Sequence, residues 1–294
     1  MTPGIAFIGA GRVAHTLSHA FVRRGITVTA IASRNPDSAL RLSRRVDGSR
    51  AVPMQDAARE ALVFVTVPDD EIAPLCASID WQPGQQVVHC SGATDVAALD
   101  HARLRGALTG GFHPLQIFSD PERAIELLAG ATVAIEGPPA LDDTLCAIAR
   151  KLDMKPLRLP QGARAAYHGS ASFAASFLVS MIDEAVAMWA TFGIAERDAL
   201  AALLPLARGT IETMATKGVA GSVSGPISRG DVGVVERHLA AFDHQGGDHG
   251  RFYRELARRQ LRLAVIDGRL DAARAQRVGD AIDADPGRSP GSVN

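Results

Sequence analysis

Two short stretches of the sequence concentrate side chains that can hold or transfer a proton. The stretch FHPLQ contains His113 and Gln116, and the stretch AAYHGSAS contains Tyr167, His168 and Ser172. Histidine titrates nearest to neutral pH, so His113 and His168 are equal candidates for donating a proton to a substrate. The alternatives are a structural histidine bonded to a loop carbonyl for His113, and a partner of Tyr167 or a helix N-terminal residue for His168. Gln116, Tyr167 and Ser172 are candidate substrate-binding residues, with packing as the alternative for the last two.

A third stretch, GPISRGD, interrupts a long helical pattern with a charged pair. Gly225 and Pro226 break the pattern, and Gly230 allows Arg229 to project from a tight bend. Because a guanidinium is planar and permanently charged, we expect Arg229 to bind an anionic group of the substrate. Asp231 is expected to cap the next helix and to orient Arg229. The alternative is a structural Arg–Asp pair that braces the turn.

A glycine pattern near the start of the chain is typical of a nucleotide-binding turn. Gly9, Gly11 and Ala14, with Arg12 and Val13 between them, form the pattern G-x-G-x-x-A directly after a strand and at the start of an amphipathic helix. Gly9 permits the turn, Gly11 lets the backbone approach a pyrophosphate, and Ala14 keeps helix and strand close. The free N–H groups of the helix N-terminus can then bind phosphate. This context predicts a dinucleotide site.

The corner after the second strand indicates which dinucleotide binds. An NAD site normally has an acidic side chain there for the ribose 2′-hydroxyl, whereas this chain has Ser33, Arg34 and Asn35. A hydroxyl, a guanidinium and an amide suit a 2′-phosphate, which a carboxylate would repel. The sequence therefore predicts NADP(H) as the cofactor, with an exposed loop arginine as the alternative for Arg34.

Two further strand ends are expected at the same cleft. Val67 and Pro68 end one strand, and Ser91 follows the next in the stretch HCSGA. Open α/β sheets bind their ligands at the carboxyl ends of strands, so we expect Val67 and Pro68 beside the cofactor and Ser91 near the reacting groups. Ser91 is the third catalytic candidate, with turn chemistry as the alternative. Asp69 and Asp70 are expected to cap the following helix.

The hydrophobic pattern divides the chain into two domains and a tail. Short apolar strands alternate with helical segments in residues 1–160, which predicts a Rossmann-type, doubly wound α/β domain with a mostly parallel sheet. Residues 161–267 are expected to form an all-helical substrate and dimerisation domain, with one long buried helix over 167–193 and a kink at Pro205. Residues 268–294 are expected to be a frayed polar tail. The expected strands are 4–9, 26–32, 61–67, 85–90, 106–112 and 131–137.

Composition narrows the class of protein. The 294 residues are 47% hydrophobic and 21% charged, as in a globular protein of about two domains. A formal net charge of −1 without a basic stripe argues against nucleic acid as a partner. No signal-peptide pattern or bilayer-length apolar run is evident, so no membrane partner is expected. Three scattered cysteines and scattered histidines argue against disulfides and against a metal site, so we expect a cytoplasmic protein.

Several stretches together resemble a family of two-domain NADP oxidoreductase-like proteins with a Rossmann first half and a helical second half known as a domain of unknown function. The matching stretches, over about residues 4–250, are IGAGRVA, ASR, VPDDEI, HCSGA, GGFHPLQIFSD, YHGSASFAASFL, PLARGTIE and GPISRGDVGVVERHL. Related families are ketopantoate reductases, pyrroline-5-carboxylate reductases and β-hydroxyacid dehydrogenases. The resemblance implies NADPH-dependent reduction of a small carboxylate-bearing carbonyl or imine, with a ketopantoate-like 2-keto acid as the best substrate candidate. It also implies a homodimer through the apolar helices of the second domain.

Two positions depart from that family's pattern. Ser176 stands where asparagine is common, and Arg164 stands where a lysine often precedes the Tyr-His pair. In the related reductases a lysine and an asparagine in this part of the chain handle the substrate and its proton. Arginine is not a proton donor at neutral pH, so Arg164 can bind a carboxylate but cannot replace a catalytic lysine. The alternatives are therefore an NADP(H)-binding sensor without turnover, or a β-hydroxyacid dehydrogenase or imine reductase.

Overall fold

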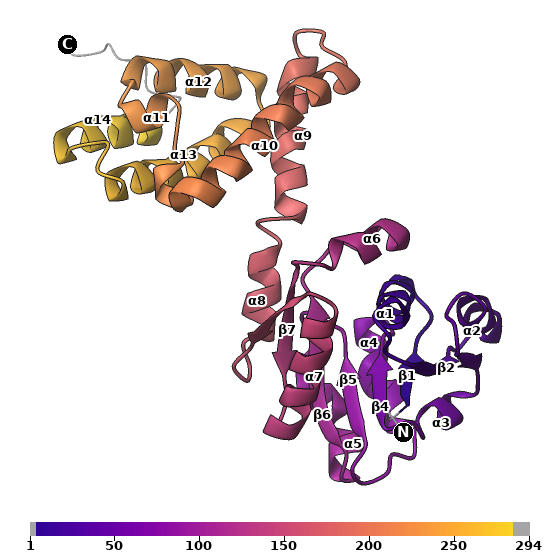
Figure 1. Cartoon of the computed structure of the whole chain (residues 1–294). Helices are drawn as coiled ribbons and strands as arrows, with labels where there is room; N and C mark the ends of the chain where they lie inside the picture. The colour runs from indigo at the N-terminus through magenta and orange to yellow at the C-terminus, as the bar shows by residue number, and fades with distance from the viewer. Residues whose placement is uncertain (1–3, 285–294) are drawn as a thin grey trace, which may run out of the picture. The chain divides into compact units, whose positions relative to one another are not determined.

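The computed structural model describes residues 4–284, and the chain forms two compact units that divide between Ala175 and Ser176 (Figure 1). The sequence places the boundary earlier, at residue 160. The first unit extends further because helix α8 (Arg164–Ala171) belongs to it, with the Arg164 side chain buried there. The candidate residues Tyr167 and His168 therefore lie in the same unit as His113.

The first unit is built on one eight-stranded sheet of order β3-β2-β1-β4-β5-β6-β7-β8, in which only the β6–β7 pair is antiparallel among the described strands. All six predicted strands are present. The two short edge strands β3 and β8 escape the sequence pattern because they are polar and largely exposed. The strands are β1 (Ile5–Ile8), β2 (Val28–Ala32), β3 (Arg50–Ala51), β4 (Leu62–Val65), β5 (Gln86–His89), β6 (Leu108–Pro114), β7 (Thr132–Glu136) and β8 (Lys155–Arg158).

Helices cover both faces of this sheet, which explains why its central strands are apolar without alternation. One face packs in a single buried cluster with α1 (Arg12–Arg23), α2 (Pro36–Ser43), α6 (Pro121–Leu127) and α7 (Pro139–Lys151). The other face packs with α3 (Met54–Ala57), α4 (Asp69–Ala77), the short 3₁₀ helix η1 (Val96–Leu99) and α5 (Asp100–Leu104). The strand order and the two helical layers are those of the predicted Rossmann fold.

The second unit is helical, as predicted. Its buried core lies among the last four helices, where Ile227, Val235, Leu239, Ala257 and Val278 pack together. The unit consists of α9 (Ser176–Ala190), α10 (Glu196–Gly221), α11 (Pro226–Arg229), α12 (Val232–Gln245), α13 (His249–Ile266) and α14 (Ala272–Asp283).

Two expectations about these helices are wrong. The segment 167–193 is not one buried helix, because turns at 172–175 separate α8 from α9, and no residue of α9 is buried by the described chain. The backbone of α10 departs from helical geometry at Gly218, whose φ of 72° glycine adopts readily, while the kink at Pro205 stays a prediction. The tail prediction fails for 272–283, which fold as α14 because Val278 and Ile282 form a buried apolar stripe. Residues 285–294 of the predicted tail lie outside the described residues.

One stretch, Arg164–Ala190, is long and apolar enough to cross a membrane by length and composition alone, although no run of that length was expected from the sequence. This criterion carries little weight here, because the turns at 172–175 divide the stretch and Arg164 is buried in the first unit.

Candidate active site

The turn between β1 and α1 has the geometry of a phosphate-binding loop. Gly9 has a φ of 114°, and a Cβ there would lie 2.6 Å from the backbone of Thr66, so the position requires glycine. Gly11 is the N-cap of α1, and a Cβ on it would meet no protein atom within 4 Å. Ala14 is fully buried where α1 packs against the sheet. The first turn of α1 therefore offers its N–H groups to an open space.

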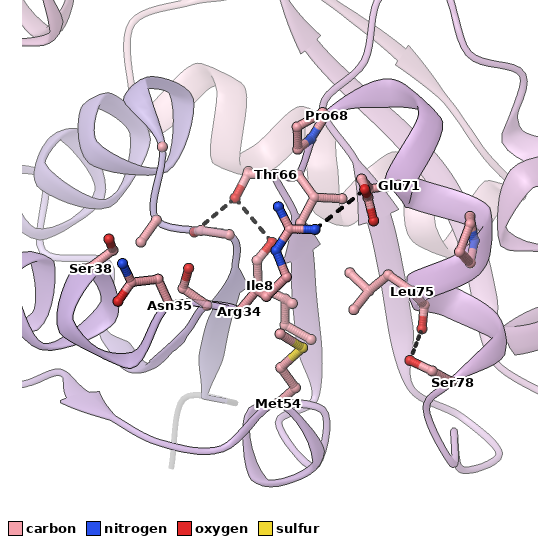
Figure 2. A pocket seen from close by; sticks show the side chains of 16 residues that line it. Ile8, Arg34, Asn35, Ser38, Met54, Thr66, Pro68, Glu71, Leu75 and Ser78 are labelled. Carbon is pink, nitrogen blue, oxygen red and sulfur yellow. Dashed lines mark hydrogen bonds and ion pairs between the residues drawn. The ribbon is translucent and has the colours of Figure 1, made fainter.

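A cavity of about 540 Å³ opens at this turn (Figure 2). It is lined by Gly9 and Gly11, by the β2 corner with Ser33, Arg34 and Asn35, and by Val67 and Pro68 beyond β4. The structure thus brings three of the predicted segments to one hollow. Arg12 is instead exposed, and Val13 packs against the core, so neither side chain is among the residues lining the cavity.

Arg34 stands at the rim with 85% of its side chain exposed, and its Nη1 lies 3.4 Å from Oε1 of Glu71 on α4. Figure 2 shows the two side chains reaching toward each other over the cavity. Asn35 is not available in the same way, because its side chain accepts a hydrogen bond from the Asp37 amide and caps α2. An open helix N-terminus with an exposed guanidinium at the far corner fits a dinucleotide that carries a 2′-phosphate. Glu71 was not singled out from the sequence, because a glutamate in a helix's first turn is common.

The predicted proton-transfer residues meet at the carboxyl ends of β5 and β6. Nδ1 of His113 lies 3.2 Å from the hydroxyl oxygen of Tyr167, and the ring centroids of His113 and His168 are 5.7 Å apart. Both imidazoles pack on Gly92, where a Cβ would lie 2.3 Å from His168 and 2.8 Å from His113. The absence of a side chain at Gly92 therefore lets the two histidines approach each other.

The surroundings of His113 change the role expected of it. Burial, together with His168 and the positive charge of Arg164, lowers the pKa of His113 to about 4, against a smaller opposing effect of Asp69. His113 is therefore neutral at pH 7, and it cannot act as an imidazolium acid. Burial also raises the pKa of Tyr167, which keeps the phenol protonated. The group with a proton to give in this pair is the Tyr167 hydroxyl.

The hydroxyl of Ser91 serves the turn that follows β5. It donates to Oδ2 of Asp69 at 2.7 Å and accepts from the amides of Ala93 and Thr94 at 3.2 and 2.9 Å. This is the turn chemistry considered as the alternative for Ser91. Asp69 and Asp70 do not cap α4 as predicted, because α4 has Pro68 at its N-cap and no side-chain cap bond. Asp69 instead ties the start of α4 to the Ser91 turn.

Two of the predicted substrate-binding residues have other roles or positions. The amide of Gln116 is used within its own loop, where Nε2 donates to the Leu127 carbonyl at 3.0 Å and Oε1 accepts from the Ile117 amide at 2.7 Å. Ser172 lies at the C-terminal end of α8, in the turns that precede α9. The side chains that contact His113 in this part of the chain are instead Tyr167 and His168.

The charged pair of the GPISRGD loop lies within the second unit. Nε of Arg229 donates to Oδ2 of Asp231 at 2.8 Å, and the Arg229 side chain is 62% exposed. Gly230 has a φ of 76°, as the tight bend requires. Asp231 occupies the N-cap position of α12, but its side chain makes no capping bond there, because it pairs with Arg229.

Arg164 does not have the exposed position that binding of a substrate carboxylate requires. Its side chain is only 1% exposed and is paired with Glu136. Glu136 could not be singled out from the sequence, because a glutamate at the end of an apolar strand is often simply exposed to solvent. Ser176, the other departure from the family pattern, is the exposed first residue of α9. Within residues 4–284 no group of three or more His, Cys, Asp or Glu side chains could hold a metal ion.

Two family descriptions match the chain, and together they cover both units. A Rossmann-like domain matches residues 3–114, and a domain of unknown function, DUF2520, matches residues 131–260. The comparison with curated proteins gives no match.

Solved structures share the fold over nearly the whole chain. Protein TM1727 from Thermotoga maritima is 24% identical, with a TM-score of 0.75 over 90% of this chain and 99% of that chain. BF3122 from Bacteroides fragilis, described as a candidate NADP oxidoreductase, is 24% identical with a TM-score of 0.68 over 88% and 97%. A reductive aminase from Aspergillus terreus, solved with NADPH and ethyl-5-oxohexanoate, is 16% identical with a TM-score of 0.64 over 95% and 99%. At these identities the likeness establishes the fold.

Proposed function

We propose that this chain, in which a Rossmann-like domain is followed by a DUF2520 domain, is an NADP-dependent oxidoreductase that reduces a carbonyl or imine group. One observation carries the proposal. An open helix N-terminus with an exposed cation and a Tyr–His pair with a protonated phenol both lie at the carboxyl ends of neighbouring parallel strands. Related folds bind dinucleotides and their reaction partners along this edge of the sheet.

Different residues would bind the cofactor and transfer the proton in such a reduction. The N–H groups at the start of α1 and the guanidinium of Arg34 would hold the pyrophosphate and the 2′-phosphate of NADPH, which supplies a hydride when bound. The Tyr167 hydroxyl would donate a proton to the oxygen or nitrogen of the substrate. Neutral His113, with its own proton on Nδ1, would stabilise the phenolate across the 3.2 Å contact.

Two observations favour a substrate that does not depend on a carboxylate. Arg164, a cation beside the two histidines, is buried and paired with Glu136, so it does not offer a carboxylate site. The loop that leaves β6 beyond His113 exposes Leu115 and Ile117, which are apolar. We therefore place a ketone or imine with an apolar substituent first. The reductive aminase from Aspergillus terreus, which shares the fold, was solved with such a ketone, ethyl-5-oxohexanoate.

A ketopantoate-like 2-keto acid is the second candidate. It is favoured by the exposed guanidinium of Arg229, which the second unit presents from a tight bend with Asp231 as its partner. A cation of this kind binds a carboxylate well.

We also propose that two copies of the chain pair through the second unit. Helices α9 and α10 expose large apolar side chains, among them Val179, Leu206, Ile211 and Val219. Exposed apolar side chains gathered on two neighbouring helices often mark a surface where copies of a chain associate. Light scattering coupled to size exclusion tests this, with a dimer expected and a monomer at micromolar concentration opposing it. A cytoplasmic location remains an expectation from the sequence.

The proposed function is tested by titrating the protein with NADPH and NADH and then following NADPH absorbance with a substrate panel. The panel contains cyclic imines, ketones offered with amines, and 2-keto acids. Turnover of any member supports the proposal and names the substrate class. Tight NADPH binding without turnover of any member would instead support the alternative function, that of an NADP(H)-binding sensor.

A further inference from the structure

Arg164 is the largest fully buried side chain of the described protein, and it neither touches the cofactor cavity nor gives a proton in the proposed reaction. Its Nε donates to Oε2 of Glu136 at 2.7 Å, and its Nη1 donates to the carbonyl oxygen of Ser91 at 2.8 Å. Burying a charge is costly unless it is paired and hydrogen-bonded. The guanidinium therefore joins three elements, namely α8, the end of β7 and the turn after β5.

The sheet is shaped around this guanidinium. A Cβ at Gly111 of β6 would lie 1.6 Å from Nη2 of Arg164 and 2.4 Å from its Cζ, so any other residue at 111 would displace the side chain. Nη2 has no hydrogen-bond partner among the described residues, which leaves a buried donor above Gly111. Glycine at this place gives up side-chain packing in a central strand, and the space is filled by the arginine.

The contacts of Arg164 lead directly to the reacting groups. The Ser91 carbonyl that it binds belongs to the turn in which Gly92 supports both His113 and His168. Arg164 is also on the same helix as Tyr167 and His168, three and four residues earlier, so it anchors the first turn of the helix that presents them. A shift of α8 would move the Tyr167 hydroxyl away from His113.

We infer that Arg164 is a positioning residue, whose buried guanidinium locks α8, β7 and the Ser91–Gly92 turn together and thereby holds Tyr167 and His168 in register with His113. The meaning of this lock for catalysis rests on the proposed function, while its effect on His113 does not. Lysine would keep the charge but lack the planar fork that binds Glu136 and Ser91 at once.

The lock also has an electrostatic consequence. His113 faces Arg164, Tyr167 and His168 from α8, Asp69 from α4 and the buried His89 from β5. Burial is the largest cause of the lowered pKa of both His113 and His89, and the positive charge of Arg164 lowers it further, whereas Asp69 raises it. Burial and His168 lower the pKa of His113 more than Arg164 does, so removing the Arg164 charge should raise that pKa only modestly from about 4.

The test compares Arg164→Gln, Arg164→Lys and Glu136→Gln, with Arg158→Gln as a matched control. Arg158 also pairs with a carboxylate in the first unit, that of Asp142, but it does not contact the Ser91 turn. The His113 pKa is read by NMR of histidine-labelled protein, with His113→Gln used for assignment. The dissociation constant for NADPH is measured on each variant.

We expect Arg164→Gln to raise the His113 pKa, and Arg164→Lys to change it little. If a substrate is turned over, both Arg164 variants and Glu136→Gln should lower kcat about tenfold or more, with NADPH affinity within about twofold, because misplacing reacting groups costs rate rather than binding. Arg158→Gln should resemble the wild type. Should Arg164→Gln not fold, Arg164→Lys and Glu136→Gln carry the test through kcat and the ring signals of His113.

The inference is overturned if Arg164→Gln leaves the His113 pKa and its ring signals as in the wild type, or if Arg158→Gln changes them equally. A substrate panel with no turnover at all would count against the proposed function only, because the NMR readout does not depend on it.

Discussion

The two ends of the candidate site are built in different ways. At the cofactor end, Gly9, Gly11 and Arg34 lie on turns that follow β1 and β2, and each acts through its own backbone geometry or its own exposed charge. At the proton-transfer end, His113 and Tyr167 depend on a buried partner, Arg164, and on Gly92. The first end consists of local motifs, and the second is a network assembled from distant parts of the chain. The effects of two substitutions should therefore add at the cofactor end, whereas at the proton-transfer end they should not be additive.

The largest expected effect is that of Tyr167→Phe. Because the phenol is the group with a proton to give, this change should lower kcat about 100-fold or more, in the range of lost general acid catalysis. NADPH affinity should stay within about twofold, because the tyrosine is not among the residues lining the cofactor cavity. Steady-state kinetics and a fluorescence titration measure both quantities.

A kcat for Tyr167→Phe within a few fold of the wild type would remove the phenol from the proton transfer. Its double variant with His113→Gln sharpens the comparison, because two members of one network should lose less together than the product of their single losses.

Arg34→Ala should have the next largest effect, confined to one cofactor. Losing the exposed guanidinium should weaken NADPH binding about 10- to 100-fold, the worth of a charge-assisted contact with phosphate, and leave NADH binding unchanged. Titration with both cofactors tests this. If the binding of both cofactors weakened equally, Arg34 would have a structural role in the turn after β2 and would not contact the 2′-phosphate.

Much of the cofactor end could be predicted from the sequence, because its features are local. The pattern from Gly9 to Ala14 and the Ser-Arg-Asn corner each lie within a few residues, and their spacing reports the backbone geometry directly. The proton-transfer end was predicted only as a set of candidate residues. That His113 would be neutral depends first on burial, which no local pattern reports, and then on the charged groups His168 and Arg164, which lie more than 50 positions later in the sequence. The role of Ser91 was undecided for the same reason, because only the folded structure brings its hydroxyl to the carboxylate of Asp69.

The stability of the protein should depend on pH through the buried histidines of the proton-transfer end. Folding lowers the pKa of His113 and of His89 from 6.5 to about 4, so the unfolded chain binds more protons between these values. The free energy of unfolding should therefore be highest above about pH 6.5 and should decrease as the pH drops toward 4. The decrease should be roughly 1–2 kcal/mol per histidine between pH 7 and 5. Urea unfolding of the wild type and of His113→Gln measures this, and the variant should show the shallower slope. Equal slopes would mean that His113 is not held neutral by the fold.

The smallest expected effect is that of Glu71→Gln at the cofactor end. The Glu71 carboxylate lies 3.4 Å from the Arg34 guanidinium and would compete with a 2′-phosphate for it. Neutralising it should tighten NADPH binding about two- to threefold, the modest worth of an exposed ion pair, with no change for NADH. Weaker NADPH binding by this variant would assign the carboxylate a direct role in holding the cofactor.

The most direct test of the central claim follows NADPH absorbance in wild type and Tyr167→Phe side by side, with the panel of imines, ketone–amine pairs and 2-keto acids. The account predicts that the wild type oxidises NADPH with at least one member, and that Tyr167→Phe binds NADPH equally well but reacts about 100-fold more slowly or less. Tight NADPH binding with no oxidation by the wild type across the whole panel would contradict it.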